Sequence, residues 1–192
     1  DEFSDFIGTH SRKLADTNGG RDVLNASPVT RSMTVDLAEG KGKIDGEAIK
    51  VSGIEDVYAG DGKDRLTGNA GNNDLAGGRG MDVLKGGKGK DDFVLWSVND
   101  SLKGSADTIL DFAKGDDIDL KRIDADASTN KNDKFDFIGT AAFDGSEGQL
   151  HFKRSKADNM TYVSGDVDGD GKADFVIDLK GLHDLRAADF IL

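Results

Sequence analysis

Glycine and aspartate recur every nine residues through the middle of this 192-residue chain, and this spacing is the feature that could carry chemistry. Written in nines, residues 59–94 read AGDGKDRLT, GNAGNNDLA, GGRGMDVLK and GGKGKDDFV. The fourth place is always glycine, the sixth is aspartate or asparagine, and the eighth is leucine or phenylalanine. A flexible glycine-rich linker is the alternative, but a linker has no reason to hold a large apolar residue at every ninth position.

The acidic sixth place favours calcium as the ligand of these repeats. Two repeats would form one turn of a coil, so residues 18 apart would lie about 4.8 Å from each other along a parallel ladder. Stacked aspartates repel each other unless a cation lies between them, and Ca²⁺ takes six to eight oxygen ligands at about 2.3–2.6 Å. The expected pairs are Asp64 with Asp82, Asn73 with Asp91, and Asp82 with Asp100, while Ile109 falls above Asp91.

Glycine belongs to the same prediction because it adopts turn conformations that other residues avoid and lets neighbouring turns stack closely. The turn carbonyls would complete the coordination of each ion. The predicted metal-site residues of the repeats are Gly60, Gly62, Asp64, Gly71, Asn73, Gly78, Gly80, Asp82, Gly87, Gly89, Asp91 and Asp100. One large apolar residue in nine makes a thin core, so we expect several Ca²⁺ ions to contribute folding free energy directly.

A second acidic motif lies near the C-terminus. Residues 166–174 read DVDGDGKAD, which has oxygen-bearing side chains and a glycine where the first half of an EF-hand loop has them. The distal glutamate of that loop is missing, and Asp174 could replace it. Calcium binding by Asp166, Asp168, Asp170 and Asp174 is one interpretation, and an acidic hairpin turn is the other.

The elements that must position these residues are short strands. Each repeat would place a turn at its first six residues and a strand at its last three, which predicts an all-β, right-handed parallel β-roll over residues 17–106. Residues 26–49 break the phase, although 33–37 (MTVDL) alternate like a strand. Alternating segments after 107 predict a C-terminal antiparallel, β-sandwich-like cap over 107–192. Residues 1–16 are assigned to the tail of an upstream region or to a linker.

Composition excludes several functions. The net charge of −12 argues against nucleic-acid and membrane-surface binding. The chain has no cysteine, and it has no apolar run near the roughly 18 residues of a membrane span. His10, His151 and His183 do not have the spacing of a zinc-protease motif, and nucleophile and phosphate-binding motifs are absent. The prediction is therefore a non-catalytic module.

The chain resembles the C-terminal module of RTX proteins, which ends serralysin-type metalloproteases and mannuronan epimerases. The resemblance covers about 17–192 and rests on the nonapeptides, on SGIEDV (52–57), GKDDF (89–93), DTILDF (107–112), the 165–175 stretch and the terminal ADFIL (188–192). It implies a type I secretion signal at the C-terminus, export from a Gram-negative bacterium, and folding on calcium outside the cell. The catalytic part of the parent protein would then lie upstream.

Polysaccharide binding is the alternative function, by resemblance to alginate-binding modules. The basic residues of the repeats could supply a groove for an anionic polysaccharide, and their simpler interpretation is charge balance on a solvated surface. These residues are Lys63, Arg65, Arg79, Lys85, Lys88 and Lys90.

Overall fold

The computed structural model describes residues 13–15, 19–126, 128–129 and 131–192, so most of the 1–16 tail lies outside the described residues. The described part consists of strands and two short 3₁₀ segments, η1 (Val98–Asp100) and η2 (Ala187–Asp189), which confirms the all-β prediction. The strands of the first half are β1 (Lys13–Ala15), β2 (Val23–Asn25), β3 (Thr34–Asp36), β4 (Lys41–Ile44), β5 (Glu47–Ser52), β6 (Asp56–Tyr58), β7 (Arg65–Thr67), β8 (Asp74–Ala76), β9 (Val83–Lys85) and β10 (Asp92–Val94). Those of the second half are β11 (Asp107–Ile109), β12 (Asp117–Asp119), β13 (Asp136–Gly139), β14 (Gln149–Ser155), β15 (Met160–Asp166), β16 (Phe175–Lys180) and β17 (Phe190–Ile191).

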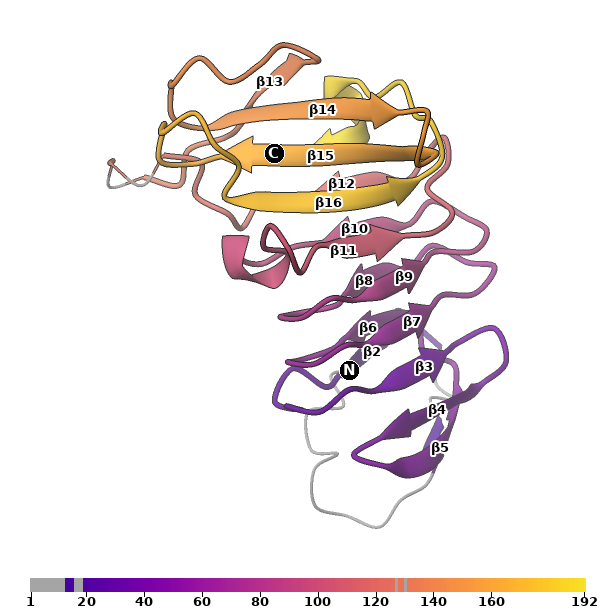
Figure 1. Ribbon diagram of the computed structural model, residues 1–192. Helices are drawn as coiled ribbons and strands as arrows, with labels where there is room; N and C mark the ends of the chain where they lie inside the picture. Colours follow the sequence, from indigo (N-terminus) through magenta and orange to yellow (C-terminus); the bar gives the residue numbers. More distant parts are fainter. Residues whose placement is uncertain (1–12, 16–18, 127, 130) are drawn as a thin grey trace.

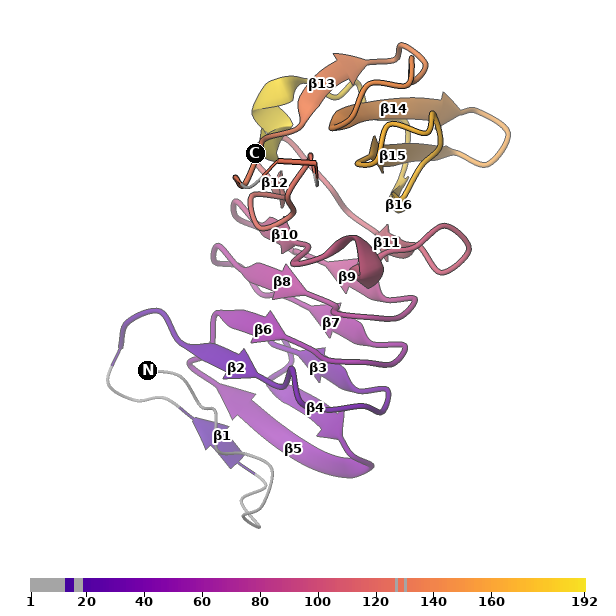
Figure 2. The same ribbon diagram turned by 90° about the vertical axis from the view of Figure 1, so that its left-hand side faces the viewer.

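The repeats form a parallel β-roll, as predicted. Alternate repeats enter opposite sheets: β7 and β9 pair in one, and β6, β8 and β10 pair in the other. Leu66 pairs with Leu84 and Leu75 pairs with Phe93, which is the 18-residue register of two repeats per coil. These eighth-place side chains are at most 1% exposed and form the centre of the core. Figures 1 and 2 show the coils stacked along an elongated molecule.

The coil continues beyond residue 106, where we predicted the roll to end. β11 pairs in parallel with β9, and β12 pairs in parallel with β10, so Leu84 lies beside Ile109 and Phe93 beside Ile118. This coil is longer because η1 and the loop after it are inserted between β10 and β11. Ser97 caps η1 by accepting a hydrogen bond from the Asn99 amide, so the insertion has a local fold of its own.

The irregular segment near 26–49 is only partly an insertion. β3 pairs in parallel with β7 and occupies a regular place in the roll. β4 and β5 then form an antiparallel hairpin on the edge of β3, and β1 pairs in parallel with β5. This part of the eleven-stranded sheet lies at the N-terminal end of the roll (Figure 1).

The C-terminal cap extends the roll without forming a separate sheet. β14, β15 and β16 are antiparallel, but β16 pairs in parallel with β11 and so joins the eleven-stranded sheet. β17 pairs in parallel with β12 in the six-stranded sheet. The Phe137 ring of β13 lies 5.1 Å, between centroids, from the Phe190 ring of β17, so side chains of the two sheets meet in a sandwich-like layer. Among the described residues, no helix is long and apolar enough to cross a membrane.

Candidate metal centre

The turns of the repeats stack directly on one another, and glycine makes this possible. Gly62 and Gly80 form a bridge between two turns on one edge of the roll. A Cβ atom at Gly80 would lie 1.6 Å from the Gly62 carbonyl oxygen, so any other residue would force the turns apart. Gly60 and Gly78 lie on the same edge, and Gly71, Gly87 and Gly89 lie in the stacked turns of the opposite edge.

Three aspartates form a ladder along the first edge. The Asp64 amide donates to Asp82 Oδ1 at 2.7 Å, and the Asp82 amide donates to Asp107 Oδ1 at 2.9 Å. Below them, the Met33 amide donates to Asp64 Oδ1 at 2.8 Å. All three carboxylates are at most 2% exposed. Each turn is therefore held to the next by a buried aspartate, and the negative charges accumulate along the ladder.

This ladder corrects one predicted pair. The 18-residue register placed Asp100 above Asp82, but Asp107 lies there, 25 residues on, because of the inserted η1 segment. Asp100 instead caps η1, and its Oδ2 accepts from the Trp96 amide at 2.8 Å and the Ser97 amide at 3.2 Å. It is buried and still repels Asp82 and Asp107 electrostatically, so it belongs to the same acidic cluster.

A second ladder follows the opposite edge. The Asn73 amide donates to Asp91 Oδ1 at 2.9 Å, and the Asp91 amide donates to Asp116 Oδ1 at 3.1 Å. Asp116, and not Ile109 as predicted, therefore lies above Asp91, again because this coil is 25 residues long. Asn73 uses its amide group to donate to the Glu55 carbonyl at 2.5 Å, so this ladder carries one charge fewer than the first.

The first ladder contains two carboxylate oxygens that have no hydrogen-bond partner among the described residues. Asp64 Oδ2 and Asp82 Oδ2 are fully buried and accept no hydrogen bond from a described residue. A buried unpaired carboxylate oxygen is costly, so such atoms are rare in native proteins unless an ion or water completes them. Both belong to the first ladder, on the two turns that the nine-residue spacing had paired.

The electrostatics agree with this geometry. Burial raises the pKa of Asp64 and of Asp91 to about 6. Burial raises the pKa of both Asp82 and Asp107 well above the ordinary carboxyl range; repulsion by Asp64 and Asp100 adds to the shift at Asp82, and repulsion by Asp82 and Asp100 adds to it at Asp107. In the absence of a cation, the fold therefore makes these carboxylates easier to protonate than they are in the unfolded chain.

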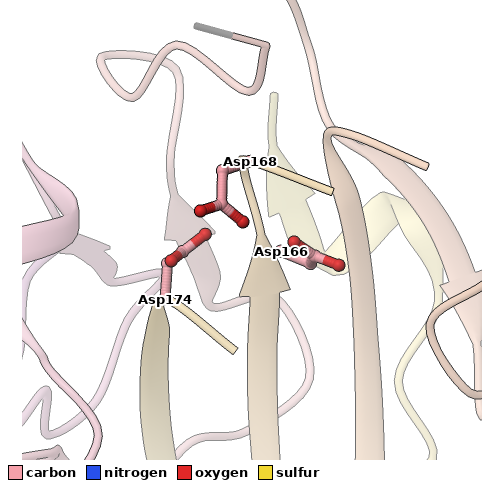
Figure 3. A group of neighbouring side chains, drawn as sticks. All are labelled: Asp166, Asp168 and Asp174. Carbon is pink, nitrogen blue, oxygen red and sulfur yellow. The ribbon is translucent and has the colours of Figure 1, made fainter. Parts of the chain in front are cut away.

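The end of β15 and the loop that follows it bring three further aspartates together (Figure 3). One carboxylate oxygen from each of Asp166, Asp168 and Asp174 lies within 4.8 Å of the others. Asp166 is fully buried, and its oxygens accept from the Gly169 and Gly171 amides, both at 2.9 Å. Asp170, the fourth predicted ligand, is outside this group, and its carboxylate pairs with Lys172 Nζ at 2.6 Å.

Residues 14–192 match the family described as peptidase M10 serralysin C terminal. The chain belongs to this family. It is 37% identical over 179 residues to the metalloprotease AprA of Pseudomonas entomophila strain L48. The aligned region covers 85% of the chain and 36% of the protease. The chain thus spans about a third of that relative's length.

Two solved structures share the fold of this serralysin C-terminal module. Both are solution structures of subunits of the Azotobacter vinelandii mannuronan C5-epimerase. The AlgE6R2 structure has a TM-score of 0.54 at 23% sequence identity, and the match covers 92% of the present chain and 94% of the AlgE6R2 chain. The AlgE6R3 structure has a TM-score of 0.51 at 26% sequence identity, and the match covers 92% of the present chain and 86% of the AlgE6R3 chain. The predicted resemblance to serralysin and epimerase modules is confirmed.

Asp107 and Asp116 of this serralysin module were missed as candidate ligands. A signal for them exists in the sequence: each precedes a buried isoleucine, Ile109 or Ile118, by two positions, as Asp82 precedes Leu84. They are also nine residues apart, as the repeats are. The insertion after β10 shifts the phase and conceals the continuation. Asp111 was missed as well, and its two oxygens accept from the Gly86 and Gly87 amides at 2.9 and 3.1 Å.

The histidines of the module are placed by backbone contacts. His151 Nδ1 lies 2.9 Å from the Ala141 carbonyl oxygen, and His183 Nε2 lies 2.9 Å from the Lys180 carbonyl oxygen. Neither belongs to a cluster of metal-binding side chains in the described part of the chain, where the grouped ligands are all aspartates. His10 lies outside the described residues. The candidate centres therefore offer oxygen ligands, which suit Ca²⁺ better than a transition metal.

Proposed function

We propose that this chain is a non-catalytic calcium-binding module that folds when Ca²⁺ occupies its stacked turns. The observation that carries the proposal is the first ladder, in which Asp64, Asp82 and Asp107 are buried in a column and two of their oxygens accept no hydrogen bond from the described part of the chain. A cation between adjacent turns would satisfy these oxygens and cancel the repulsion. Sodium or potassium would supply less charge per site, and Mg²⁺ demands a tighter octahedral geometry than stacked turns offer.

The proposed ligands combine side chains with turn carbonyls. Asp64, Asp82 and Asp100, now joined by Asp107, would serve the first edge, with Gly60, Gly62, Gly78 and Gly80 in its turns. Asn73 and Asp91, now joined by Asp111 and Asp116, would serve the second edge, with Gly71, Gly87 and Gly89. Asp166, Asp168 and Asp174 would form a separate site between β15 and β16, without Asp170.

Calcium would act as a switch between compartments. The resemblance to RTX modules implies that the parent protein leaves a Gram-negative cell through a type I system that reads the C-terminus. Cytosolic calcium is too low to fill sites of moderate affinity, while extracellular calcium is millimolar, as for other extracellular calcium modules. The chain would then stay extended during export and fold outside, where the two ladders become neutralised.

The C-terminal strand couples these two roles. Phe190 is 7% exposed, and the Ile191 carbonyl accepts from the Leu120 amide at 2.9 Å. A signal at residues 187–192 would thus be partly covered once the module has folded. Recognition by the export machinery must then precede folding, which is consistent with a chain that folds only when calcium is available.

Polysaccharide binding by the repeats is less well supported. Two repeats per coil send their turns to opposite edges, so Lys63 and Arg79 lie on one edge and Lys88 and Lys90 on the other. Arg65 and Lys85 lie on the outer face of the eleven-stranded sheet. The six basic residues are therefore distributed over three surfaces and do not line a single groove.

Circular dichroism tests the proposed function. The purified chain in a calcium chelator should lack the β-sheet spectrum and cooperative melting, and about 1–10 mM Ca²⁺ should restore both. The same concentration of Mg²⁺ should not. A metal-free chain that melts cooperatively at neutral pH would contradict the proposal. Protease, lipase and glycosidase assays should detect no turnover in the folded module, and turnover abolished by a point substitution in this chain would overturn the non-catalytic assignment.

A further inference from the structure

A cavity of about 590 Å³ lies beside the first edge of the roll, between its stacked turns and the loop that follows η1 (Figure 1). The turns contribute Lys63, Arg79 and Met81 to its walls, and the loop contributes Leu102. We refer to it as the edge cavity. Its described lining residues include two basic side chains and no acidic one, although the net charge of the chain is −12. The volume is within the range of about 300–1,000 Å³ that is typical of small-molecule sites.

Two exposed apolar side chains meet at the edge cavity. Met81 and Leu102 are each 41% exposed, and Leu182 is the one other large hydrophobic side chain among the described residues that is comparably exposed. A single exposed apolar side chain is ordinary in a folded protein, but two from separate segments that line one cavity form a shared apolar surface. Covering this surface would remove apolar area from water, which favours a ligand with an apolar part.

The loop wall is fixed by hydrogen bonds, so the exposure of Leu102 does not come from a loose segment. The neighbouring Ser101 is fully buried, and its hydroxyl donates to the Val176 carbonyl at 2.5 Å and accepts from the Asp107 amide at 2.8 Å. Leu102 also forms an antiparallel bridge with Phe175 of β16. The wall is therefore preformed, and its neighbours hold Leu102 in its exposed position.

The turn wall carries the positive charge. Gly62, which precedes Lys63, donates its amide to the Arg79 carbonyl at 2.8 Å, so the two cations come from adjacent turns. Neither cation forms a salt bridge with a described residue. Burial raises the pKa of Asp100, and the charge of Arg79 opposes this increase, so Arg79 partly offsets the acidic cluster. Lys63 has no counter-ion in the described part of the chain, which favours a ligand with one acidic group.

We propose that the edge cavity binds an amphiphilic monoanion, which has one acidic headgroup on an unbranched aliphatic chain, as a fatty acid has. The headgroup would pair with Lys63 and Arg79, and the aliphatic chain would cover Met81 and Leu102. The inference rests on the proposed function in one respect, because the turn wall exists only once the first edge of the roll has folded.

Other ligand classes fit these walls less well. A polysaccharide or an inorganic phosphate would leave Met81 and Leu102 uncovered. A nucleotide would find no aromatic ring to stack on among the described lining residues. An extended peptide pairs with an open strand edge, whereas these walls consist of turns and a loop.

Isothermal titration of the calcium-loaded chain with octanoate and with octanesulfonate tests the proposal. Free Ca²⁺ should be the same in cell and syringe. We expect saturable binding of both anions, and binding at least about tenfold weaker for acetate, which lacks the chain, and for octanol, which lacks the charge. The affinity for octanoate should fall as ionic strength rises from about 0.01 to 0.15 M, because the Debye length falls from about 30 to about 8 Å.

Variants of each wall locate the ligand. K63Q/R79Q should weaken octanoate binding about tenfold and leave the weak binding of octanol unchanged. Its matched control is K88Q/K90Q, which removes exposed cations from the third and fifth places of a repeat on the opposite edge and should bind within about twofold of the parent. Leu102→Ser should weaken octanoate binding about fivefold, whereas Leu182→Ser, at the other exposed leucine, should not.

Calcium content and circular dichroism of each variant should match those of the parent, which separates loss of the site from loss of the fold. Octanol that binds as tightly as octanoate, or equal losses in the two double variants, would overturn the proposal. Tighter binding of octyltrimethylammonium would overturn the assigned chemical class. A chain that folds on calcium but binds no octanoate would contradict this inference alone. A chain that folds and binds octanoate without calcium would support it and contradict the proposed function.

Discussion

Replacing Asp82 with asparagine removes one negative charge from the middle of the first ladder while retaining the shape of the side chain. The substitution keeps an acceptor for the Asp64 amide, which Asp82 Oδ1 now accepts at 2.7 Å. It also places an amide group where Asp82 Oδ2 lies buried without a hydrogen-bond partner among the residues that the structure describes. The account therefore predicts opposite effects with and without metal.

The magnitude follows from the electrostatics. Burial, and then repulsion by neighbouring aspartates, raises the pKa of Asp82 to about 7. Against an ordinary value near 3.9, this corresponds to at most about 4 kcal/mol at neutral pH. Because part of that cost is shared with Asp107, we expect Asp82→Asn to stabilise the metal-free chain by about 2 kcal/mol. In the calcium-loaded chain it should instead weaken the ladder, since Asp82 lies between two other carboxylates.

Calorimetric calcium titration and circular dichroism in chelator provide the assay. In chelator, Asp82→Asn should be more ordered than the parent. With calcium, it should lose more ions than Asp91→Asn, because Asp91 has a carboxylate neighbour, Asp116, on one side and the uncharged Asn73 on the other. Asp184→Asn, on an exposed loop residue, is the control. Equal ion losses at 82 and 91, or a metal-free chain destabilised by Asp82→Asn, would refute the reasoning.

Three further predictions follow from the same geometry. In chelator, the chain should gain β-structure as the pH falls from about 7 toward 4, because the pKa values of Asp64 and Asp91 are raised to about 6 and that of Asp82 to about 7. A carboxyl group whose pKa is raised in the folded state stabilises the fold fully below its unfolded-state pKa, near 3.9, and this stability is lost as the pH rises through its folded-state pKa. A circular dichroism spectrum that loses β-structure on acidification in chelator would contradict this. Gly80→Ala should prevent calcium-induced folding, because its Cβ would lie 1.6 Å from the Gly62 carbonyl oxygen. The control Gly104→Ala also has a positive φ but faces open space, so it should lower the free energy of unfolding by only about 1–2 kcal/mol. Equal melting temperatures of the two calcium-loaded variants would exclude the stacking argument. Deleting residues 187–192 should block secretion and also lower the melting temperature, because β17 pairs with β12 and Phe190 is buried; normal export of the truncated chain would show that the signal lies elsewhere.

The repeat pattern was sufficient to predict the roll because one geometric unit recurs. A glycine at every fourth place and a buried residue such as Leu84 at every eighth require a turn and an inward strand residue each time, so the 18-residue register follows. The coil after β10 could not be predicted in the same way. Its inserted segment has no period, and only tertiary packing shows that Ile109 lies beside Leu84.

The candidate sites were predictable to the same extent. Asp64 and Asp82 were paired correctly by spacing alone, since both lie within the regular repeats. Asp100 was misplaced because the spacing cannot report that its side chain turns back to cap η1. The row of Lys13, Lys50 and Lys41 was not predictable either, because these residues become neighbours only through the pairing of β1, β5 and β4.

The most direct measurement is a crystal structure of the calcium-loaded chain with anomalous scattering data collected to locate the ions. The account predicts ions between the stacked turns on both edges of the roll, with Asp64 Oδ2 and Asp82 Oδ2 within about 2.3–2.6 Å of a metal. Ladders that keep this geometry but contain no ion at saturating calcium would contradict it.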